Sequence, residues 1–225
     1  MKNFKYNRTG FTMLEFVMVI VVLGILAGAG VGSYDNNTRQ QAADIILSDI
    51  RDTQHLALID NKFVPTITNW QRAYWRIGFN FCDGSQNYYE YIGSDSQDYS
   101  TRINNNEAAL DPLSGKIMNW ITTENCDNGG KSNGATGISE RIFLSYKYGI
   151  NRIQFIGTSC SPAQYIGFDN LGRPYQGFTG RTSVSYTNRF RTPCTIKFTL
   201  DSGDDFSIRI EAETGYAHIV DQNNS

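Results

Sequence analysis

This 225-residue sequence has few histidines, no closely spaced cysteines and no excess of charge of one sign. The chain has two histidines, and none of its four cysteines form a CxxC pair, so a zinc site is not expected. Lys and Arg number 20 against 22 Asp and Glu, which indicates neither a nucleic-acid partner nor a disordered acidic tract. The length suits one domain with an appendage.

A catalytic constellation is also missing. His218 and Asp221 stand three residues apart, and Ser202 or Ser207 can be imagined beside them, but no G-x-S-x-G nucleophile turn accompanies them. A histidine on a strand beside an acid is more often structural than catalytic, and the same interpretation applies to His55. We therefore expect no enzyme activity and no cofactor.

The distribution of charge is uneven at the N-terminus. Residues 1–10 carry three basic side chains and no acid, and residues 16–34 carry no charge. Three interpretations fit this pattern: a secretory signal peptide cut after Ala27-Gly28-Ala29, a plain membrane anchor, or a leader peptide followed by an anchor. The uncharged run has 19 residues, about 28 Å as a helix, which is close to the thickness of a bilayer core.

Glu15 separates these interpretations. A carboxylate in an apolar helix costs about 2.5–3.5 kcal/mol at the bilayer centre and less near the interface, and a signal peptide gains nothing from it. Glu15 lies four residues after Phe11, which follows Gly10. If the chain is cut between Gly10 and Phe11, a new α-amino group lies one helical turn from the carboxylate. The opposite charges then neutralise each other, within one subunit or between neighbours.

The run Gly10-Phe11-Thr12-Met13-Leu14-Glu15 and the apolar stretch after it resemble the leader signal of type IV pilins and type II secretion pseudopilins. The resemblance implies that a prepilin peptidase removes residues 1–10, that Phe11 becomes the N-methylated terminus, and that Glu15 acts in assembly. It also implies a single-pass inner-membrane subunit with its globular domain in the periplasm. An inner-membrane assembly platform and its ATPase then draw the subunit into a pseudopilus with other pilin-like subunits.

The apolar stretch departs from the family in one respect, because many members carry a proline about two-thirds along this helix and here there is none. Gly24, Gly28 and Gly32 stand four residues apart instead, and small residues at this spacing let helices approach closely. Each glycine also weakens a helix by about 1 kcal/mol. The sequence leaves open whether they form a packing face or only a flexible stretch.

The predicted helix continues as an amphipathic half over residues 35–60. Apolar side chains recur at three- and four-residue spacing, and charged residues, Asp49 among them, fill most of the other face. Asp60-Asn61 is expected to end the helix. We therefore predict an α+β, pilin-like fold. A transmembrane half-helix over 11–34 leads into this amphipathic half, which packs on an antiparallel β-sheet in a globular domain over 61–225.

The globular domain is expected to be rich in β-structure, with residues 94–140 as a long loop that contains a short helical piece around 107–120. Turn signals link the last three strands into a meander. The predicted strands cover Tyr74–Phe81, Tyr88–Ile92, Arg141–Tyr148, Arg152–Gly157, Gln164–Asp169, Thr195–Leu200, Phe206–Ala212 and Tyr216–Val220.

Three segments extend the resemblance to the H-type minor pseudopilins of type II secretion, namely residues 44–65, 165–174 and 208–215. We therefore favour a secretion pseudopilus, with a minor pilin of a type IV pilus (adhesion, motility or DNA uptake) as the alternative. A further alternative is a membrane-tethered binding module that uses the leader only for export. Its ligand site would be the 94–140 loop.

Four cysteines, Cys82, Cys126, Cys160 and Cys194, all follow the apolar segment. The even number and the position favour disulfides in an oxidising compartment over free buried thiols. Three pairings are possible, and the sequence does not choose among them. We expect Cys82–Cys126 and Cys160–Cys194, because this choice closes the shorter loops.

Acidic side chains gather at two places where calcium could find oxygen ligands. Asp201, Asp204 and Asp205 crowd one turn, and Asp95 and Asp98 form a weaker group. Neither spacing matches an EF-hand loop. A solvated turn is the preferred interpretation, and we expect no metal ion.

Aromatic and basic residues suggest two possible surfaces. The aromatic residues between Trp70 and Tyr91 can form a recognition surface, although alternate aromatics on strands usually pack in the core. Basic residues recur between Arg173 and Arg191, but aromatic residues among them indicate an ordinary strand-and-loop region. No nucleic-acid partner is expected.

Overall fold

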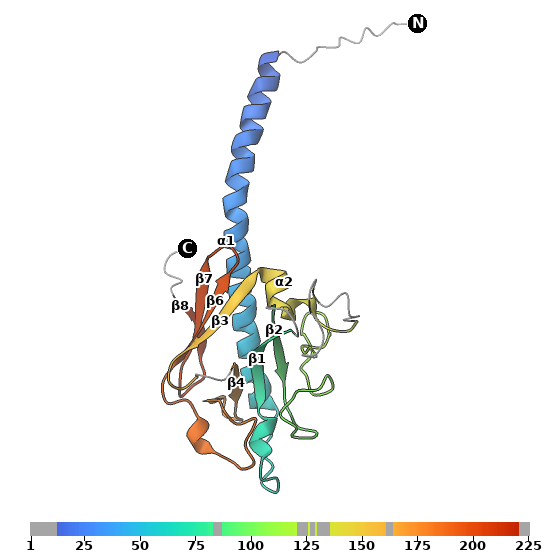
Figure 1. Cartoon of the computed structure of the whole chain (residues 1–225), viewed down its shortest axis with the longest axis vertical. Helices are drawn as coiled ribbons and strands as arrows, with labels where there is room; N and C mark the ends of the chain where they lie inside the picture. Colours follow the sequence, from blue (N-terminus) through green and yellow to red (C-terminus); the bar gives the residue numbers. More distant parts are fainter. Residues whose placement is uncertain are drawn as a thin grey trace, which may run out of the picture. The chain divides into compact units, whose positions relative to one another are not determined.

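One long helix precedes a β-rich domain in the computed structural model, which describes residues 13–82, 87–120, 126, 129, 136–160 and 164–220, with only the backbone for residues 28–37 (Figure 1). Helix α1 (Met13–Ile59) has 47 residues. The residues up to Thr38 and those from Arg39 onward form two separate compact units. No helix among the described residues is both long and apolar enough to cross a membrane, so the predicted transmembrane half-helix is not confirmed.

The described part of the second unit contains two antiparallel sheets of four strands each, where the sequence predicts one sheet. The first sheet has the order β2-β1-β4-β5, with β1 (Trp75–Phe81), β2 (Tyr88–Gly93), β4 (Tyr165–Phe168) and β5 (Pro174–Tyr175). The second has the order β3-β6-β7-β8, with β3 (Ile150–Ile156), β6 (Cys194–Leu200), β7 (Asp205–Ile210) and β8 (Ala217–Val220). Short helices η1 (Trp70–Ala73), η3 (Glu140–Ile142), α2 (Leu144–Tyr148) and η4 (Tyr186–Asn188) connect them.

Alternating burial along β6 and β7 confirms the predicted meander of the last three strands. Every second residue of β6 is buried, from Cys194 to Leu200, and β7 alternates in the same way. Phe198 on β6 pairs with Phe206 on β7, and their rings stack with centroids 4.9 Å apart. One face of this sheet therefore belongs to the core, as the period of two requires.

The second half of α1 is buried in the same core as both sheets. Its buried apolar residues follow helical spacing: Ala42, Ala43, Ile46, Ile50 and Ala57. They belong to one hydrophobic cluster with Ile77 and Phe79 of the first sheet and Phe198 of the second. Tertiary packing of this apolar stripe holds the half-helix, as expected for an amphipathic helix, and the helix ends at Ile59 as predicted.

Polar side chains on α1 fix its position against the turns of the β-domain. Arg51 Nη2 donates to the carbonyl of Ala217 at 2.9 Å. Gln54 Nε2 donates to the carbonyls of Gly172 and Thr214, at 2.7 and 2.8 Å. The residue after Thr214 is Gly215, which has a φ of +67°, and a Cβ there would lie 2.3 Å from the Gly172 oxygen. Only glycine fits this junction of two turns and the helix.

Two sequence-based predictions are wrong. Segment Arg141–Tyr148 is not a strand but contains η3 and α2, because Gly149 takes a left-handed conformation with φ +67° and caps a short helix. Residues 107–120 contain no helix. Leu110 and Ile117 form an antiparallel bridge around a turn that contains Pro112 and Gly115. Proline and a glycine with φ +67° favour such a turn over a helix.

The burial of the second half-helix predicts a sharp difference between two shortened chains. A chain that begins at Asp35 keeps the whole buried stripe and is expected to be monomeric and cooperatively folded. A chain that begins at Asn61 loses Ala42, Ile46 and Ile50 and exposes the core residues that they cover, so it is expected to aggregate. Size-exclusion chromatography and thermal unfolding measure both properties. Equal melting temperatures for the two chains would show that the half-helix is not part of the core.

Candidate functional site

The N-terminal motif lies partly outside the described residues. Gly10 and Phe11, the predicted cleavage and methylation positions, are not described, and neither is Thr12. Glu15 lies in the first turn of α1, where a carboxylate interacts favourably with the helix dipole. Gly24, Gly28 and Gly32 all lie within the same helix, and a Cβ at Gly24 would meet no other atom. This open space leaves room for the close approach of another helix.

The helix around Glu15 presents apolar side chains on every face. Their exposure ranges from 47% at Val19 to 88% at Met13. The exposed set comprises Met13, Leu14, Phe16, Val17, Met18, Val19, Ile20, Val21, Val22, Leu23, Ile25 and Leu26. A helix that is apolar all round is stable only when something apolar covers it. Glu15 is the single charged side chain in this stretch of 13–27, so this surface combines an apolar contact area with one acid.

A second concentration of ionisable groups is buried where α1 meets the β-domain. Asp49 of α1 and Glu90 of β2 are both fully buried, although the sequence places Asp49 on the polar face of the helix. Arg141 of η3 forms an ion pair with Asp49. Its Nε also lies 3.3 Å from Asp111 Oδ1. One arginine thus serves two carboxylates, and Glu90 has no cation of its own within 4 Å among the described residues.

Burial decides the protonation of this cluster. Burial raises the pKa of Asp49 to about 6, against the opposing effects of a hydrogen bond with Glu90 and the charge of Arg141. Burial and the charge of Asp49 raise the pKa of Glu90 well above its usual value. Asp49 Oδ2 and both oxygens of Glu90 lack a donor from any other described group, so the two carboxyls hydrogen-bond each other. Such a bond needs a proton on one of the two carboxyls, and the raised pKa of Glu90 favours that residue.

Asp111 remains ionised in the same cluster. Burial raises its pKa, but hydrogen bonds from Ser114 and Ser139, at 2.6 and 2.7 Å, outweigh this effect and the pKa is lowered. The cluster therefore has two carboxylates, one arginine and one neutral acid. It ties α1 to β2 and η3 and fixes the rotation of the helix, because only one face of α1 carries Asp49.

A third group of acids organises a loop. One carboxylate oxygen each from Asp95, Asp98 and Glu107 lies within 4.8 Å of the others. Asp95 Oδ2 accepts the N–H of Thr101 at 2.7 Å, and Glu107 Oε2 accepts the N–H of Asn104 at 3.1 Å. These carboxylates thus accept hydrogen bonds from backbone N–H groups for which the loop supplies no carbonyl partner. The structure thus joins Asp95 and Asp98 to Glu107, which the sequence did not single out.

The turn that holds Asp201, Asp204 and Asp205 directs its carboxylates to different partners. Asp201 Oδ1 accepts from Asn151 at 3.0 Å, Asp204 accepts from the hydroxyl of Ser202 at 3.2 Å, and Asp205 pairs with a lysine on β6. The three do not converge on one point, so the favoured calcium candidate of the sequence is not a ligand set.

The residues considered for catalysis lie apart from one another. His55 is exposed on α1, and His218 lies on β8, where it stacks on Tyr216 with ring centroids 5.5 Å apart. Ser207 pairs with Val220 in the sheet, two pairs along the ladder from Arg209 and His218. Asp221 lies outside the described residues.

Both predicted disulfides are confirmed. Cys82 is bonded to Cys126, and Cys160 is bonded to Cys194. All four cysteines are buried. Each bridge closes a loop, of 44 and 34 residues, and loops of this length give a stabilisation of about 2–4 kcal/mol.

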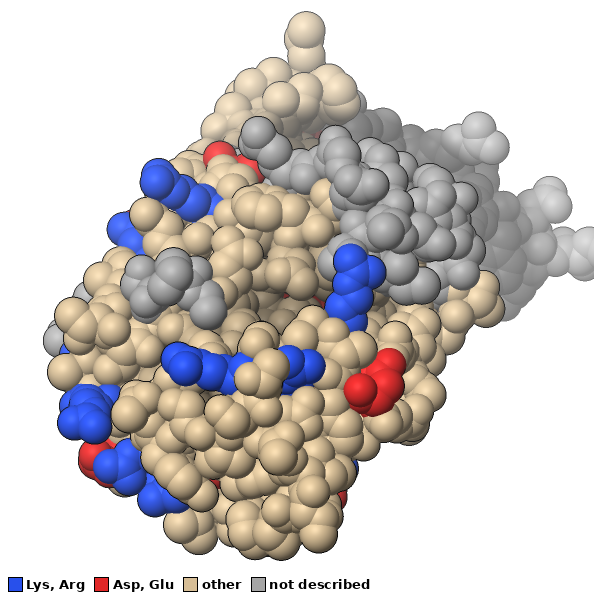
Figure 2. Space-filling model, turned by 60° about the horizontal axis from the view of Figure 1, so that its bottom comes forward, with Lys and Arg blue, Asp and Glu red and all other residues tan. Residues whose placement is uncertain are grey.

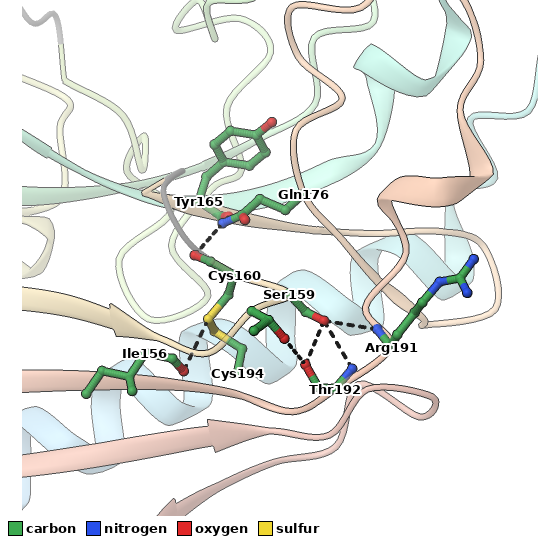
Figure 3. The surroundings of a disulfide bond; sticks show 9 residues. Ile156, Ser159, Cys160, Tyr165, Gln176, Arg191, Thr192 and Cys194 are labelled. Atoms are coloured by element: carbon green, nitrogen blue, oxygen red, sulfur yellow. Dashed lines mark hydrogen bonds between the residues drawn. A yellow bond between two sulfur atoms is a disulfide. The ribbon is translucent and has the colours of Figure 1, made fainter.

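The Cys160–Cys194 bridge connects the two sheets through its surroundings (Figure 3). Gln176 Nε2, just after β5, donates to the carbonyls of Cys160 and Tyr165 at 3.0 and 3.1 Å. Ser159 Oγ accepts the N–H of Thr192 at 3.0 Å. The bridge therefore lies at a point where the loop after β3, the start of β6 and the edge of the first sheet are held together.

Charged side chains are dispersed on the face drawn in Figure 2, where Lys and Arg form separate groups with uncharged surface between them. Several arginines of the 173–191 segment already have acceptors. Arg173 Nη2 lies 2.7 Å from Asp169 Oδ2, and Arg189 lies 3.6 Å from Glu213. Arg181 Nε donates to the carbonyl of Gly177 at 3.4 Å.

Comparison of the chain with protein-family models, with curated proteins and with solved structures finds no match. The sequence motif and the geometry of the described residues are therefore the basis for proposing a function.

The Asp49–Glu90 pair predicts an unusual dependence of stability on pH. Because folding raises both pKa values, this pair favours the folded state at low pH, and the contribution is lost as pH rises through about 6 and beyond. Glu90→Gln keeps a donor to Asp49 and removes the titration. Relative to the unchanged chain, the variant should gain free energy of unfolding at pH 8 and change little at pH 4.

Urea unfolding followed by near-ultraviolet circular dichroism at both pH values measures this difference. Glu140→Gln, at an exposed position on η3, is the matched control and should follow the unchanged chain at both pH values. An identical change of stability with pH in the Glu90→Gln variant and the unchanged chain would show that Glu90 does not titrate in this range.

Proposed function

We propose that this chain is a filament subunit of the type IV pilin-like class, similar to an H-type minor pseudopilin of type II secretion. Residues 1–10 are a leader that a prepilin peptidase removes, and residues 11–34 anchor the subunit in the inner membrane. The β-domain lies in the periplasm. An assembly platform and its ATPase then move the subunit into a short filament with other pilin-like subunits.

The observation that carries the proposal is the coincidence of the motif with an uncovered apolar helix. Gly10-Phe11 and Glu15 stand directly before and within a segment whose apolar side chains from Met13 to Leu26 are all at least 47% exposed. Lipid covers such a surface before assembly, and neighbouring helices cover it in a filament. The two confirmed disulfides agree with an oxidising compartment for the domain.

Glu15 has a defined task in this mechanism. After cleavage, the α-amino group of Phe11 carries a positive charge at the start of the apolar segment. Where lipid and neighbouring helices exclude water, each of the two charges is costly alone, and pairing reduces that cost. A pair between adjacent subunits sets the axial register of one helix against the next. The carboxylate thus selects one arrangement of an otherwise uniform apolar surface.

The secretion pseudopilus is favoured over a type IV pilus by the H-type resemblance of residues 44–65, 165–174 and 208–215. A tethered binding module is the second candidate, and a pocket formed partly by residues 101–105 favours it. The two candidates are compatible, since a minor subunit can carry a ligand site on its domain.

The cleavage position gives the direct test of the proposal. The mature chain should begin at N-methylated Phe11 and contain 215 residues, since 225 − 10 = 215. Intact-mass analysis of the protein purified from membranes measures this directly. A mature terminus at Gly30, after Ala27-Gly28-Ala29, would indicate an ordinary signal peptide and remove the family assignment.

Substitution of Glu15 separates assembly from processing. Glu15→Gln keeps size and polarity but removes the charge, and Glu15→Val removes the acid, so both should insert and be largely processed. Both should enter filaments at least about tenfold less than the unchanged chain, because the amino terminus loses its partner. The measurement is the amount of subunit in sheared filaments relative to the amount in membranes, with Leu14→Ile as the apolar control.

Mixed crosslinking tests whether the pair forms between subunits. Cysteines placed in the 11–30 segment should crosslink unchanged subunits to one another, and far less to Glu15→Gln subunits. Unchanged filament incorporation of both Glu15 variants would remove the carboxylate from assembly and leave the motif as a peptidase signal alone.

A further inference from the structure

A pocket of about 410 Å³ lies on the first sheet, under the loop that follows β2. Ile77 and Phe79 point into the hydrophobic core, so the alternating residues Arg76 and Asn80 lie on the opposite face of β1. Tyr91 and Tyr89 stand opposite Gly78 and Asn80 on β2 and share that face. The lining is Arg76, Asn80, Tyr89, Tyr91, Thr101, Arg102, Ile103, Asn104, Asn105, Asn119 and Trp120.

Gly78 makes room for the aromatic wall. A Cβ at this position would lie 2.4 Å from the ring of Tyr91, so the tyrosine ring lies flat across the glycine. A residue with a side chain on this strand would push Tyr91 away from the sheet. The close contact fixes the position of the Tyr91 ring against the sheet.

Arg76 is the chemical centre of the pocket. Its side chain is buried, with 1% of the residue exposed; Nη2 donates to the carbonyl of Thr101 at 2.8 Å, and Nη1 donates to the carbonyl of Arg72 at 3.3 Å. Nε has no partner, and no carboxylate oxygen of the described residues lies within 4.0 Å of the guanidinium. Asp95 interacts electrostatically with the guanidinium from beyond 4.0 Å, which compensates the buried charge only in part, and an anion in the pocket completes its surroundings.

The other residues that line the pocket indicate the chemical class of that anion. Arg102 adds a second cation at an exposed position, and no Asp or Glu lines the pocket. Asparagine amides, which both donate and accept, occur at Asn80, Asn105 and Asn119. Tyr91 adds a half-buried aromatic ring, whereas Tyr89 and Trp120 line the pocket from the core and are 1% and 5% exposed. Two cations, several amides and aromatic faces suit a ring with many hydroxyls, one apolar face and one acid group.

The rim of the pocket contains strained backbone. Thr101 has a φ of +83°, which a β-branched residue rarely adopts. Its N–H is held by Asp95 and its carbonyl by Arg76, at 2.7 and 2.8 Å. The acidic loop group around Asp95 thus holds Thr101 over the pocket. Strain of this kind persists only where the surroundings fix it, as they do at many ligand sites.

From these observations we infer that the pocket binds an acidic saccharide, a pyranose that carries a carboxylate. The carboxylate takes the unsatisfied Nε of Arg76 and the charge of Arg102. The asparagine amides meet the ring hydroxyls, and an aromatic face covers the apolar side of the ring. The volume lies near the lower end of the range for small-molecule pockets, about 300–1,000 Å³, and suits one or two sugar rings. This site is independent of the filament proposal, since it lies wholly within the β-domain.

Saturation-transfer NMR on the full chain in detergent micelles, with D-glucuronate as the probe, tests the site. D-glucuronate should bind at least about tenfold more tightly than D-glucose, inorganic phosphate or an N-acetylated glutamyl amide. Arg102→Gln changes an exposed residue and should weaken glucuronate about fivefold or more without unfolding the domain. Arg76→Gln should abolish binding. Arg152→Gln, an exposed arginine on β3 of the other sheet, is the matched control and should leave binding unchanged.

Each other result overturns the inference in a specific way. Equal binding of glucose would remove the role of the arginines. Phosphate as tight as glucuronate would indicate a general anion site, and a tighter glutamyl amide would indicate a peptide site. No binding of glucuronate, or an equal effect of Arg102→Gln and Arg152→Gln, would place the ligand elsewhere or exclude it. None of these outcomes bears on cleavage at Gly10, so failure here is distinct from failure of the filament proposal.

Discussion

The burial of one face of the second half of α1 is the constraint on which the domain depends. Ala42, Ile46 and Ile50 lie in the same core as residues of both sheets, so the helix is the common support of the two. A two-sheet domain without it would leave apolar faces uncovered. The polar contacts of Arg51 and Gln54 with the turns of the β-domain set the position of the helix along its axis.

A buried polar cluster adds specificity to this packing. Asp49 and Glu90 are both fully buried and share a proton, and Arg141 compensates Asp49 and Asp111. Apolar packing tolerates small rotations of a helix, whereas a charge that is buried without its partner is strongly destabilising. The cluster therefore accepts one rotation of α1.

In the proposed mechanism, the two parts of α1 use their apolar side chains in opposite ways. From Met13 to Leu26 the large apolar side chains of α1 are exposed, whereas the second part of the helix buries its apolar stripe within its own domain. The pocket beside Arg76 adds a third surface, on the face of β1 away from the core. The proposed assembly surface and the proposed ligand site therefore use separate residues.

The sequence by itself determined the local elements whose signal is short-range. Asp60-Asn61 predicted the end of α1, alternation and turn residues predicted the meander of β6, β7 and β8, and loop length favoured the observed disulfide pairs. It failed at Arg141–Tyr148 and around 107–120, where turns at Gly149 and Gly115 interrupt patterns that also suit other elements. For Asp49 the signal was present, since it follows Ile46 by three residues and precedes Ile50, but its charge suggested the polar face.

Only the tertiary structure decided which distant groups meet. The division into two sheets, the Asp49–Glu90–Arg141 cluster and the pocket around Arg76 each combine residues that are far apart in sequence. No local pattern predicts that Arg76 on β1 is buried without an ion pair. Its burial depends on the distant segment 101–120, which covers it. Local propensity acts over a few residues, whereas the protonation and the ligand chemistry of a buried group depend on everything that surrounds it.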